Sequence, residues 1–414
     1  MRIVLSVCLL FVGQCAAQAQ PYWNQFRGPQ GNGQTDATGL PVEFGEKQNL
    51  TWKTPIPGKA WASPVIWENQ IWLANATEDG KRLSAVCVDL KSGEVLHDVL
   101  VFEVAEPEFC HPTNSYASCT PFVESGRVYL HYGTYGTACL DTKTGEKLWE
   151  RRDLHCDHFR GPASSPLVEG DLLYLTYDGI DIQYVVALNK HTGTTVWQKD
   201  RNINYGTDNP DQKKGYSTPT VIEAAGRRQL ISPSAAETIS YDPATGEELW
   251  RVHHGGMNAA ARPLYVHGLV YITAGDGGKS LVAVRPEGRG DVTNSQIEWE
   301  TGKSVPKRSS LIIVGDLLFM VSDSGTASCL DAKSGEIHWS KRLPGEYWAS
   351  PLLANGLLYF FSKGGDVVVL KAAAEYEEVA ESKLDSGMNA SPAVSGNSLI
   401  VRTFKHLYRF DKAQ

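Results

Sequence analysis

The densest group of chemically versatile residues is the stretch HCDHFR, His155 to Arg160, which holds two histidines, a cysteine, an aspartate and an arginine. Such side chains can bind a metal, act as acids and bases, or hydrogen-bond a loop. A metal site needs three or four converging ligands, which His155, Cys156 and His158 could supply together with His111 from another loop. Residue types alone leave these alternatives open, so the place of the stretch in the fold has to decide.

The elements around this stretch come from a repeat. The pattern D-x-x-[ST]-G-E-x-x-W occurs at residues 141–149, 242–250 and 331–339, and in weaker form at 189–197 and 89–97. An Asp or Asn that can hydrogen-bond a turn, followed by a Gly free to take positive φ, is typical of a hairpin between two strands. The repeat therefore predicts β-turns and not a nucleotide-binding loop.

A second landmark fixes the inner strand of each unit. An apolar anchor residue is followed eight positions later by an aromatic or apolar residue, and a unit with a few extra residues follows Pro219. The anchors are Pro64, Pro121, Pro166, Pro219, Pro263, Leu311, Pro351 and Pro392. They recur every 40 to 57 residues, the period of a four-stranded propeller blade. We expect an all-β, eight-bladed β-propeller of antiparallel blades.

The ends of the chain complete this organisation. The last unit lacks a fourth strand, and Leu50 to Lys53 supplies one, so we expect the N-terminal strand to close the ring. Residues 1–19 read as a secretory signal peptide, with an apolar run and an Ala-Gln-Ala cleavage site. Residues 20–49 form an irregular N-terminal arm, and residues 50–414 form a single propeller domain.

The stretch His155 to Arg160 lies between the outermost strand (D) of one blade and the innermost strand (A) of the next. The D-to-A and B-to-C loops share one face of a propeller, where aromatic and polar groups either plug the narrowing axis or bind a ligand. A dyad of His158 with Asp178 or Asp181 is conceivable there, although no nucleophile motif accompanies it. The ligand-face candidates are Trp61, Asn114, Tyr116, His158, Arg160, Asp178, Asp181, Tyr216, Asn258, Arg262, Trp348 and Asn389.

The cysteines divide by position. Cys87, Cys139 and Cys329 each stand two residues before a turn Asp, so we expect small, buried and unpaired thiols in different blades. Cys110 and Cys119 lie in one loop of the ligand face, and in an oxidising compartment we expect a disulfide between them in preference to a bridge to Cys156.

Charge and hydropathy exclude several classes. A net charge of -8 without any basic run argues against a nucleic-acid partner. After the first residues no segment reaches the roughly 18 to 20 apolar residues that a membrane span needs. We expect an exported, soluble protein, periplasmic or extracellular, and a monomer because a closed ring leaves no sheet edge that needs a partner.

The blade motifs LDTKTGEKLW and CLDAKSGEIHW resemble the repeats of pyrroloquinoline-quinone (PQQ) proteins over roughly residues 50 to 411. The start WNQFRGPQGNG with TWKTPIPGKAWASPV resembles exported bacterial PQQ-like repeat proteins. The resemblance implies an eight-bladed propeller, a fold used both by quinoprotein alcohol dehydrogenases and by a lipoprotein of the outer-membrane β-barrel assembly machine. Fold alone does not choose between chemistry and binding.

The dehydrogenase alternative implies PQQ on the axis, Ca²⁺ on carboxylate and amide oxygens, and an Asp base, with activity on alcohols or sugars. This chain has no adjacent Cys-Cys pair and no C-x-x-C-H haem motif. We therefore expect a non-enzymatic propeller that binds a ligand, or a protein or glycan partner, on the face of its D-to-A and B-to-C loops.

Overall fold

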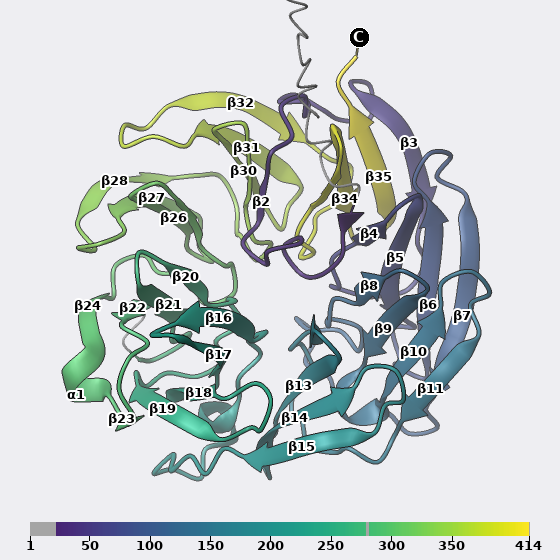
Figure 1. Ribbon diagram of the computed structural model, residues 1–414. Coiled ribbons are helices and arrows are strands. Elements are labelled where there is room, and N and C mark those ends of the chain that lie inside the picture. The colour runs from purple at the N-terminus through teal and green to yellow at the C-terminus, as the bar shows by residue number, and fades with distance from the viewer. Residues whose placement is uncertain (1–21, 279–280, 414) are drawn as a thin grey trace, which may run out of the picture.

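The computed structural model describes residues 22–278 and 281–413, and the expected signal peptide lies outside them. Over this part of the chain eight small sheets stand around a central axis like the blades of a propeller (Figure 1). Strands within a blade follow one another along the chain from the axis outward and pair antiparallel. The predicted eight-bladed β-propeller is confirmed.

The strands of each blade run in the order A, B, C, D from the axis outward. Blades one and two contain β4 (Val65–Trp67), β5 (Gln70–Ala76), β6 (Arg82–Asp89), β7 (Val95–Glu103), and β8 (Phe122–Glu124), β9 (Arg127–His131), β10 (Thr137–Asp141), β11 (Lys147–Arg151). Blades three and four contain β12 (Leu167–Glu169), β13 (Leu172–Asp178), β14 (Gln183–Asn189), β15 (Thr195–Asp200), and β16 (Thr220–Ala224), β17 (Arg227–Pro233), β18 (Glu237–Tyr241), β19 (Glu248–His253).

The second half of the ring repeats this arrangement. Blades five and six contain β20 (Leu264–Val266), β21 (Leu269–Thr273), β22 (Leu281–Val284), β24 (Ile297–Thr301), and β25 (Ile312–Val314), β26 (Leu317–Val321), β27 (Thr326–Asp331), β28 (Ile337–Arg342). Blades seven and eight contain β29 (Leu352–Ala354), β30 (Leu357–Phe361), β31 (Asp366–Lys371), β32 (Glu378–Lys383), and β33 (Ala393–Ser395), β34 (Ser398–Arg402), β35 (His406–Asp411), β3 (Leu50–Pro55).

Short elements interrupt the pattern. Between β22 and β24 the chain inserts β23 (Gly290–Asp291), which pairs with β19 of blade four, and the short helix α1 (Thr293–Gln296). The loops on the ligand face carry two 3₁₀ turns, η1 (Gly133–Tyr135) and η2 (Pro210–Lys213). Within the described ranges no helix has the length and apolar character needed to cross a membrane.

The repeated D-x-x-[ST]-G motif forms the C-to-D turn, as predicted. In blade four Asp242 Oδ1 accepts hydrogen bonds from the backbone N–H groups of Ala244 and Thr245, at 2.9 and 3.0 Å. Gly246 follows with a φ of +70°, a conformation that costs a residue with a Cβ about 1–2 kcal/mol. The motif is therefore a local device that reverses the chain between two outer strands.

The Trp that ends the motif contacts the next blade, whereas the Asp hydrogen-bonds the backbone of its own turn. Trp197 of blade three packs over Gly246 in the turn of blade four and donates its Nε1–H to Pro243 O at 2.9 Å. The same bond to the next blade's turn is made by Trp149 to Lys190 O, Trp299 to Ala332 O, Trp339 to Ala373 O and Trp52 to Leu90 O. The repeat Gly lies against this Trp at Gly93, Gly193, Gly246 and Gly335, whereas Trp339 packs on Tyr376 of blade seven.

The hydrophobic core lies between adjacent blades. Between blades two and three, for example, Tyr129 and Phe122 pack with Leu173 and Tyr177, all of them buried. Cys87, Cys139 and Cys329 are buried, unpaired strand residues of three different blades, as the sequence predicted. Each sheet is covered on both faces by its neighbours, and the buried apolar side chains of the described residues form seven clusters distributed around the ring.

The ring closes through β3. This N-terminal strand pairs antiparallel with β35, with Lys53 opposite Tyr408, and so becomes the D strand of blade eight. The predicted closure is confirmed. Trp52 on β3 then reaches the turn of blade one, so this boundary has the same interlock as the one between blades three and four.

The first part of the N-terminal arm, residues 22–35, runs along the inner strands of the ring (Figure 1). Its strand β1 (Tyr22–Trp23) pairs with β4 of blade one, and β2 (Gln34–Thr35) pairs in parallel with β29 of blade seven. Between them Arg27 donates to Leu311 O of blade six at 2.5 Å. This part of the arm therefore lies against the inner strands around the central channel and contacts blades one, six and seven. Further on, Phe44 packs between Phe361 of blade seven and Phe410 of blade eight.

Candidate functional site

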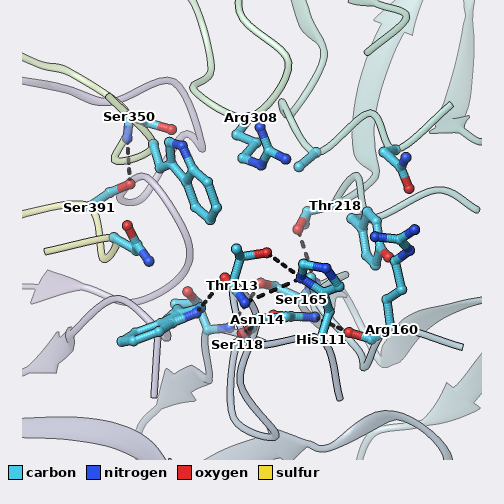
Figure 2. A pocket seen from close by; sticks show the side chains of 18 of the residues that line it. His111, Thr113, Asn114, Ser118, Arg160, Ser165, Thr218, Arg308, Ser350 and Ser391 are labelled. Carbon is cyan, nitrogen blue, oxygen red and sulfur yellow. Dashed lines mark hydrogen bonds between the residues drawn. The ribbon is translucent and has the colours of Figure 1, made fainter. Parts of the chain in front are cut away.

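The D-to-A loops converge on one axial pocket with a volume of about 390 Å³ (Figure 2). We call the residue three places before each blade's anchor its pocket position. The eight pocket positions are Trp61, Ser118, Ala163, Tyr216, Ala260, Arg308, Trp348 and Asn389, and every one of them lines the pocket. The register of the inner strands therefore aims one side chain per blade at the axis.

A ring of hydroxyl groups holds these loops together. We call the residue immediately before each anchor its ring position, occupied by Ser63, Thr120, Ser165, Thr218, Arg262, Ser310, Ser350 and Ser391. Each hydroxyl oxygen accepts a hydrogen bond, 2.9–3.0 Å long, from the backbone N–H of the ring residue in the preceding blade. For example, Ser391 N–H donates to Ser63 Oγ, and Ser165 N–H donates to Thr218 Oγ1. These hydrogen bonds connect neighbouring blades around the pocket.

Blade five breaks this ring. Its ring position carries Arg262, which has no hydroxyl to accept a bond from Thr218 and instead binds the N-terminal arm. The Arg262 Nη1 donates to Gln25 Oε1 at 3.0 Å and to Phe26 O at 2.9 Å. Phe26 itself lines the pocket, so the arm contributes to the site.

The charged groups of the pocket are paired with one another. Arg160 forms a two-pronged ion pair with Asp211, with Nε–Oδ1 at 2.6 Å and Nη2–Oδ2 at 2.7 Å. Arg308 pairs with Asp323. Its guanidinium also lies 4.2 Å from the ring centre of Trp348, within range of a cation–π contact. The wall therefore presents little uncompensated charge to a ligand.

Two amide oxygens in the pocket lack partners. Asn258 Oδ1 and Asn389 Oδ1 are both buried, and neither accepts a hydrogen bond from the described residues. They come from the D-to-A loops that lead into blades five and eight. A buried acceptor left unpaired costs about 1–3 kcal/mol, so a ligand that donates to these oxygens gains that energy.

The structure brings seven of the twelve ligand-face candidates together in the pocket. They are Trp61, Asn114, Arg160, Tyr216, Asn258, Trp348 and Asn389. The lining also contains residues that were not among the candidates, and His111 was considered only as a metal ligand. They are the ring residues Ser63, Thr120, Ser165, Thr218, Ser350 and Ser391, the pocket-position residues Ser118, Ala163, Ala260 and Arg308, and Phe26, Thr113, Asp211, Met257 and Asp276. Arg308 stands at a pocket position and could have been chosen from the sequence, whereas nothing in the sequence marks Phe26.

The other five candidates lie outside the pocket. His158 is buried, and its Nε2 accepts the backbone N–H of Thr134 at 3.1 Å. Burial, the ammonium of Lys214 and His131 hold the pKa of His158 well below its ordinary value. The hydroxyl of Tyr116 donates to Glu108 O at 2.8 Å, and Arg262 binds the arm.

The two aspartates do not form a dyad with His158. Asp178 is buried in an ion pair with Arg201, with Oδ1–Nε at 2.6 Å. Burial raises the pKa of Asp178, and Arg201 acts against that rise. Asp181 Oδ1 accepts the backbone N–H of Asp157 at 2.8 Å. Both carboxylates hold the B-to-C region of blade three in place.

The suggested metal ligands do not converge. His111 hydrogen-bonds Thr113 through Nδ1 at 2.7 Å, while His155 Nδ1 lies 3.1 Å from Thr134 Oγ1 and Cys156 Sγ lies 3.6 Å from both ring nitrogens of His158. In the part of the chain that the structure describes, no group of three or more His, Cys, Asp or Glu side chains is placed to hold a metal ion. Loop hydrogen bonding is what these residues do.

The expected disulfide is not formed. Cys110 and Cys119 are both free thiols, and so is Cys156. Cys119 is buried, whereas Cys110 is partly exposed and its Sγ lies 3.8 Å from Arg160 O of the neighbouring loop. The two cysteines of this loop therefore belong to different environments, and the loop is held instead by Asn114, which donates to Arg160 O at 2.9 Å.

The resemblance to quinoproteins makes the fit of PQQ and Ca²⁺ a specific question. The lining contains two carboxylates, Asp211 and Asp276, and each is already paired with a cation, Arg160 and Lys307 respectively. Ca²⁺ is held by several oxygen ligands that normally include carboxylates free to bind it. The donors of this pocket do not fit a Ca²⁺–quinone pair, and we derive no reaction through one.

Comparison with known sequences gives two kinds of relative. The chain is 25% identical over 302 residues to a quinoprotein ethanol dehydrogenase of Pseudomonas aeruginosa, which covers 61% of this chain and 44% of that one. It therefore spans less than half of the dehydrogenase. It is 22% identical over 321 residues to the outer membrane protein assembly factor BamB of Shewanella oneidensis, covering 71% of this chain and 74% of that one.

Solved structures agree on the fold. BamB from Moraxella catarrhalis superimposes with a TM-score of 0.60 at 13% identity, covering 87% of this chain and 99% of that one. A europium-containing methanol dehydrogenase superimposes with a TM-score of 0.63 at 11% identity, covering 94% of this chain and 98% of that one.

The sequence also matches the model of a protein family described as outer membrane protein assembly factor BamB, over residues 85–200, 181–300 and 279–403. The chain thus belongs to this family of PQQ-like β-propeller repeat proteins.

Proposed function

We propose that this protein is an exported, non-enzymatic binding or scaffold propeller, and that its ligand or partner segment enters the axial pocket on the face of the D-to-A and B-to-C loops. The observation that carries the proposal is the pair of buried, unpartnered amide oxygens of Asn258 and Asn389. Each is a buried acceptor that no group of the described residues satisfies. A ligand with suitably placed O–H or N–H groups satisfies both.

The rest of the wall narrows the chemistry of that ligand. Because Arg160 and Arg308 are each engaged by a carboxylate, the pocket favours a polar but uncharged group over an ion. Trp61 and Tyr216 add aromatic surface. Hydroxyl groups of a glycan and backbone amides of an extended peptide both combine hydrogen-bond donors with apolar faces.

Two further considerations support this reading. The N-terminal sequence has the pattern expected of a secretory signal peptide, which supports a periplasmic or extracellular location. One group of relatives carries the name assembly factor, which suits a propeller that docks other molecules. The carboxylates of the pocket, already paired, speak against the dehydrogenase alternative.

The test is a screen of the purified chain on glycan and peptide arrays, with calorimetry on every hit. We expect a ligand whose binding weakens at least tenfold in Asn258→Leu/Asn389→Leu, since each lost hydrogen bond is worth about 1 kcal/mol. Tyr116→Phe, outside the pocket, is the matched control and should bind like the wild type. The proposal fails if all hits bind the double variant equally well, or if PQQ binds in a saturable, Ca²⁺-dependent manner.

A further inference from the structure

Two arginines without a counter-ion lie against the same segment of the arm, Gly31 to Gly33, beside the central channel. Arg27, from the N-terminal arm, and Arg262, from the ring position of blade five, are 1% and 3% exposed. In the described ranges no ion pair joins either guanidinium to a carboxylate. Residues 1–21 contain no Asp or Glu. Two buried positive charges therefore share one region of the protein.

Both guanidiniums keep donors that nothing accepts. Arg27 Nη2 donates to Asn32 O at 2.8 Å and to Leu311 O, but its Nε and Nη1 are buried and without a partner. The Nη1 of Arg262 serves Gln25 and Phe26, yet its Nε is likewise buried and unpartnered. Three N–H-bearing nitrogens thus remain free around the two side chains.

Other buried arginines of the ring show that this is unusual here. Arg201 is paired with the carboxylate of Asp178. Arg402 donates to Ala62 O at 3.1 Å, to Ala74 O at 2.8 Å and to Asn75 Oδ1 at 3.0 Å, and has no buried nitrogen without a partner. Arg27 and Arg262 have no carboxylate partner, and each keeps at least one buried nitrogen without an acceptor.

The energetics call for a negative charge. Burial lowers the pKa of Arg262 to about 10, and burial together with the nearby charge of Arg262 lowers the pKa of Arg27 to about 9. Both groups still carry their protons at neutral pH. Like charges that are buried, repel each other and keep unsatisfied donors are stable only when something compensates them.

We propose that a small inorganic anion, with chloride as the simplest case, binds between Arg27 and Arg262 beside the central channel. The arm wraps closely around both groups, because a Cβ at Gly31 would overlap the Arg262 guanidinium and one at Gly33 would lie 2.6 Å from Arg27 Nη2. This closeness favours a small anion. Arg262 does not line the axial pocket, so the anion site is separate from the ligand site proposed above.

The anion would explain how the arm is fixed. It would neutralise two positive charges that otherwise push the arm and blade five apart, and it would link them through shared hydrogen bonds. Anion binding to the folded state alone stabilises that state in proportion to the logarithm of the anion concentration. The full chain should therefore be more stable in chloride than in a bulky anion at the same ionic strength.

The experiment measures the melting temperature of the full chain in sodium gluconate with chloride or bromide added at constant ionic strength. We expect a rise of about 2 °C for each tenfold step in halide. A crystal grown in bromide should show an anomalous peak between Arg27 and Arg262. A peak absent from that place, or a melting temperature that is independent of halide, overturns the proposal.

Two variants keep the result specific. Arg262→Ser places a hydroxyl at the ring position, as in most other blades, where it can accept the N–H of Thr218, so the variant should fold and lose the halide effect. Arg308→Ser removes a pocket arginine that already has a carboxylate partner and should keep the effect. The reverse pattern would place the anion in the pocket and refute the site. Neither variant touches Asn258 or Asn389, so this result is independent of the ligand screen.

Discussion

Replacing Gly246 by Ala isolates the energy of one blade-to-blade interlock. Gly246 has a φ of +70°, and a Cβ there would lie 2.6 Å from Cε3 of Trp197 and 2.9 Å from Cγ of Lys199. Gly226, in the A-to-B turn of the same blade, has a φ of +69° and no atom within 4 Å of such a Cβ. The two substitutions therefore share the backbone strain and differ in the contact.

The magnitudes follow from this pairing. Ala in the left-handed region costs about 1–2 kcal/mol, and both variants bear that cost. At Gly246 the new methyl group must also displace the Trp197 ring, and forcing an extra carbon into a packed contact costs about 1–3 kcal/mol. We expect Gly226→Ala to lower the free energy of unfolding by about 1–2 kcal/mol, and Gly246→Ala by about 2–5 kcal/mol.

Urea unfolding followed by tryptophan fluorescence and far-UV circular dichroism gives both values from the shift of the midpoint, provided that the slope with denaturant is unchanged. If the two variants lie within about 0.5 kcal/mol of each other, the Trp197 ring yields freely and the proposed role of the Gly–Trp contact is wrong.

Two further outcomes test other parts of the structure. Burial lowers the pKa of His254 to about 4 and that of His131 to about 3, below the ordinary 6.5, so the folded state favours neutral imidazole and its stability should decline as the pH falls below about 6.5. Each such histidine adds up to about 1.4 kcal/mol per pH unit to the slope of the unfolding free energy against pH. His254→Gln should therefore reduce that slope, measured by urea unfolding between pH 7 and 4.5, and an unchanged slope would contradict this. Thr120→Val removes the acceptor of the buried Ser63 N–H and should cost about 1–3 kcal/mol in thermal unfolding, whereas Thr120→Ser keeps that acceptor and should cost clearly less; equal losses would show that the hydroxyl ring contributes nothing.

The blades could be predicted from the sequence because their signals are local. The Asp and Gly of each C-to-D turn determine a hairpin within a few residues, and the anchors mark every inner strand. The strand at Leu50–Pro55 could also be paired correctly, since the last unit lacked one strand. The period then fixed the register of the D-to-A loops, which is why every pocket position reaches the axial pocket.

The depth of individual side chains was beyond such reasoning. His158 and Arg160 stand two residues apart in one loop, yet His158 points into the interior and Arg160 lines the pocket. His158 Nδ1 lies 3.4 Å from the ammonium of Lys214, a partner in a loop more than fifty residues later that the local sequence does not reveal. The arm was equally inaccessible, because Phe26 and Arg27 have no periodicity to mark them and their partners come from blades five and six.

The ring of hydroxyl bonds has a consequence for how such a protein changes over time. The ring positions hold the backbone of the loops, while the pocket positions two residues earlier are relieved of that duty. Mutations at Tyr216 or Trp348 can then alter what the cavity recognises without breaking the hydrogen bonds that hold the loops. The eight pocket positions, one per blade, can therefore be substituted one after another, so that natural divergence or a designed library can change the specificity of the pocket stepwise.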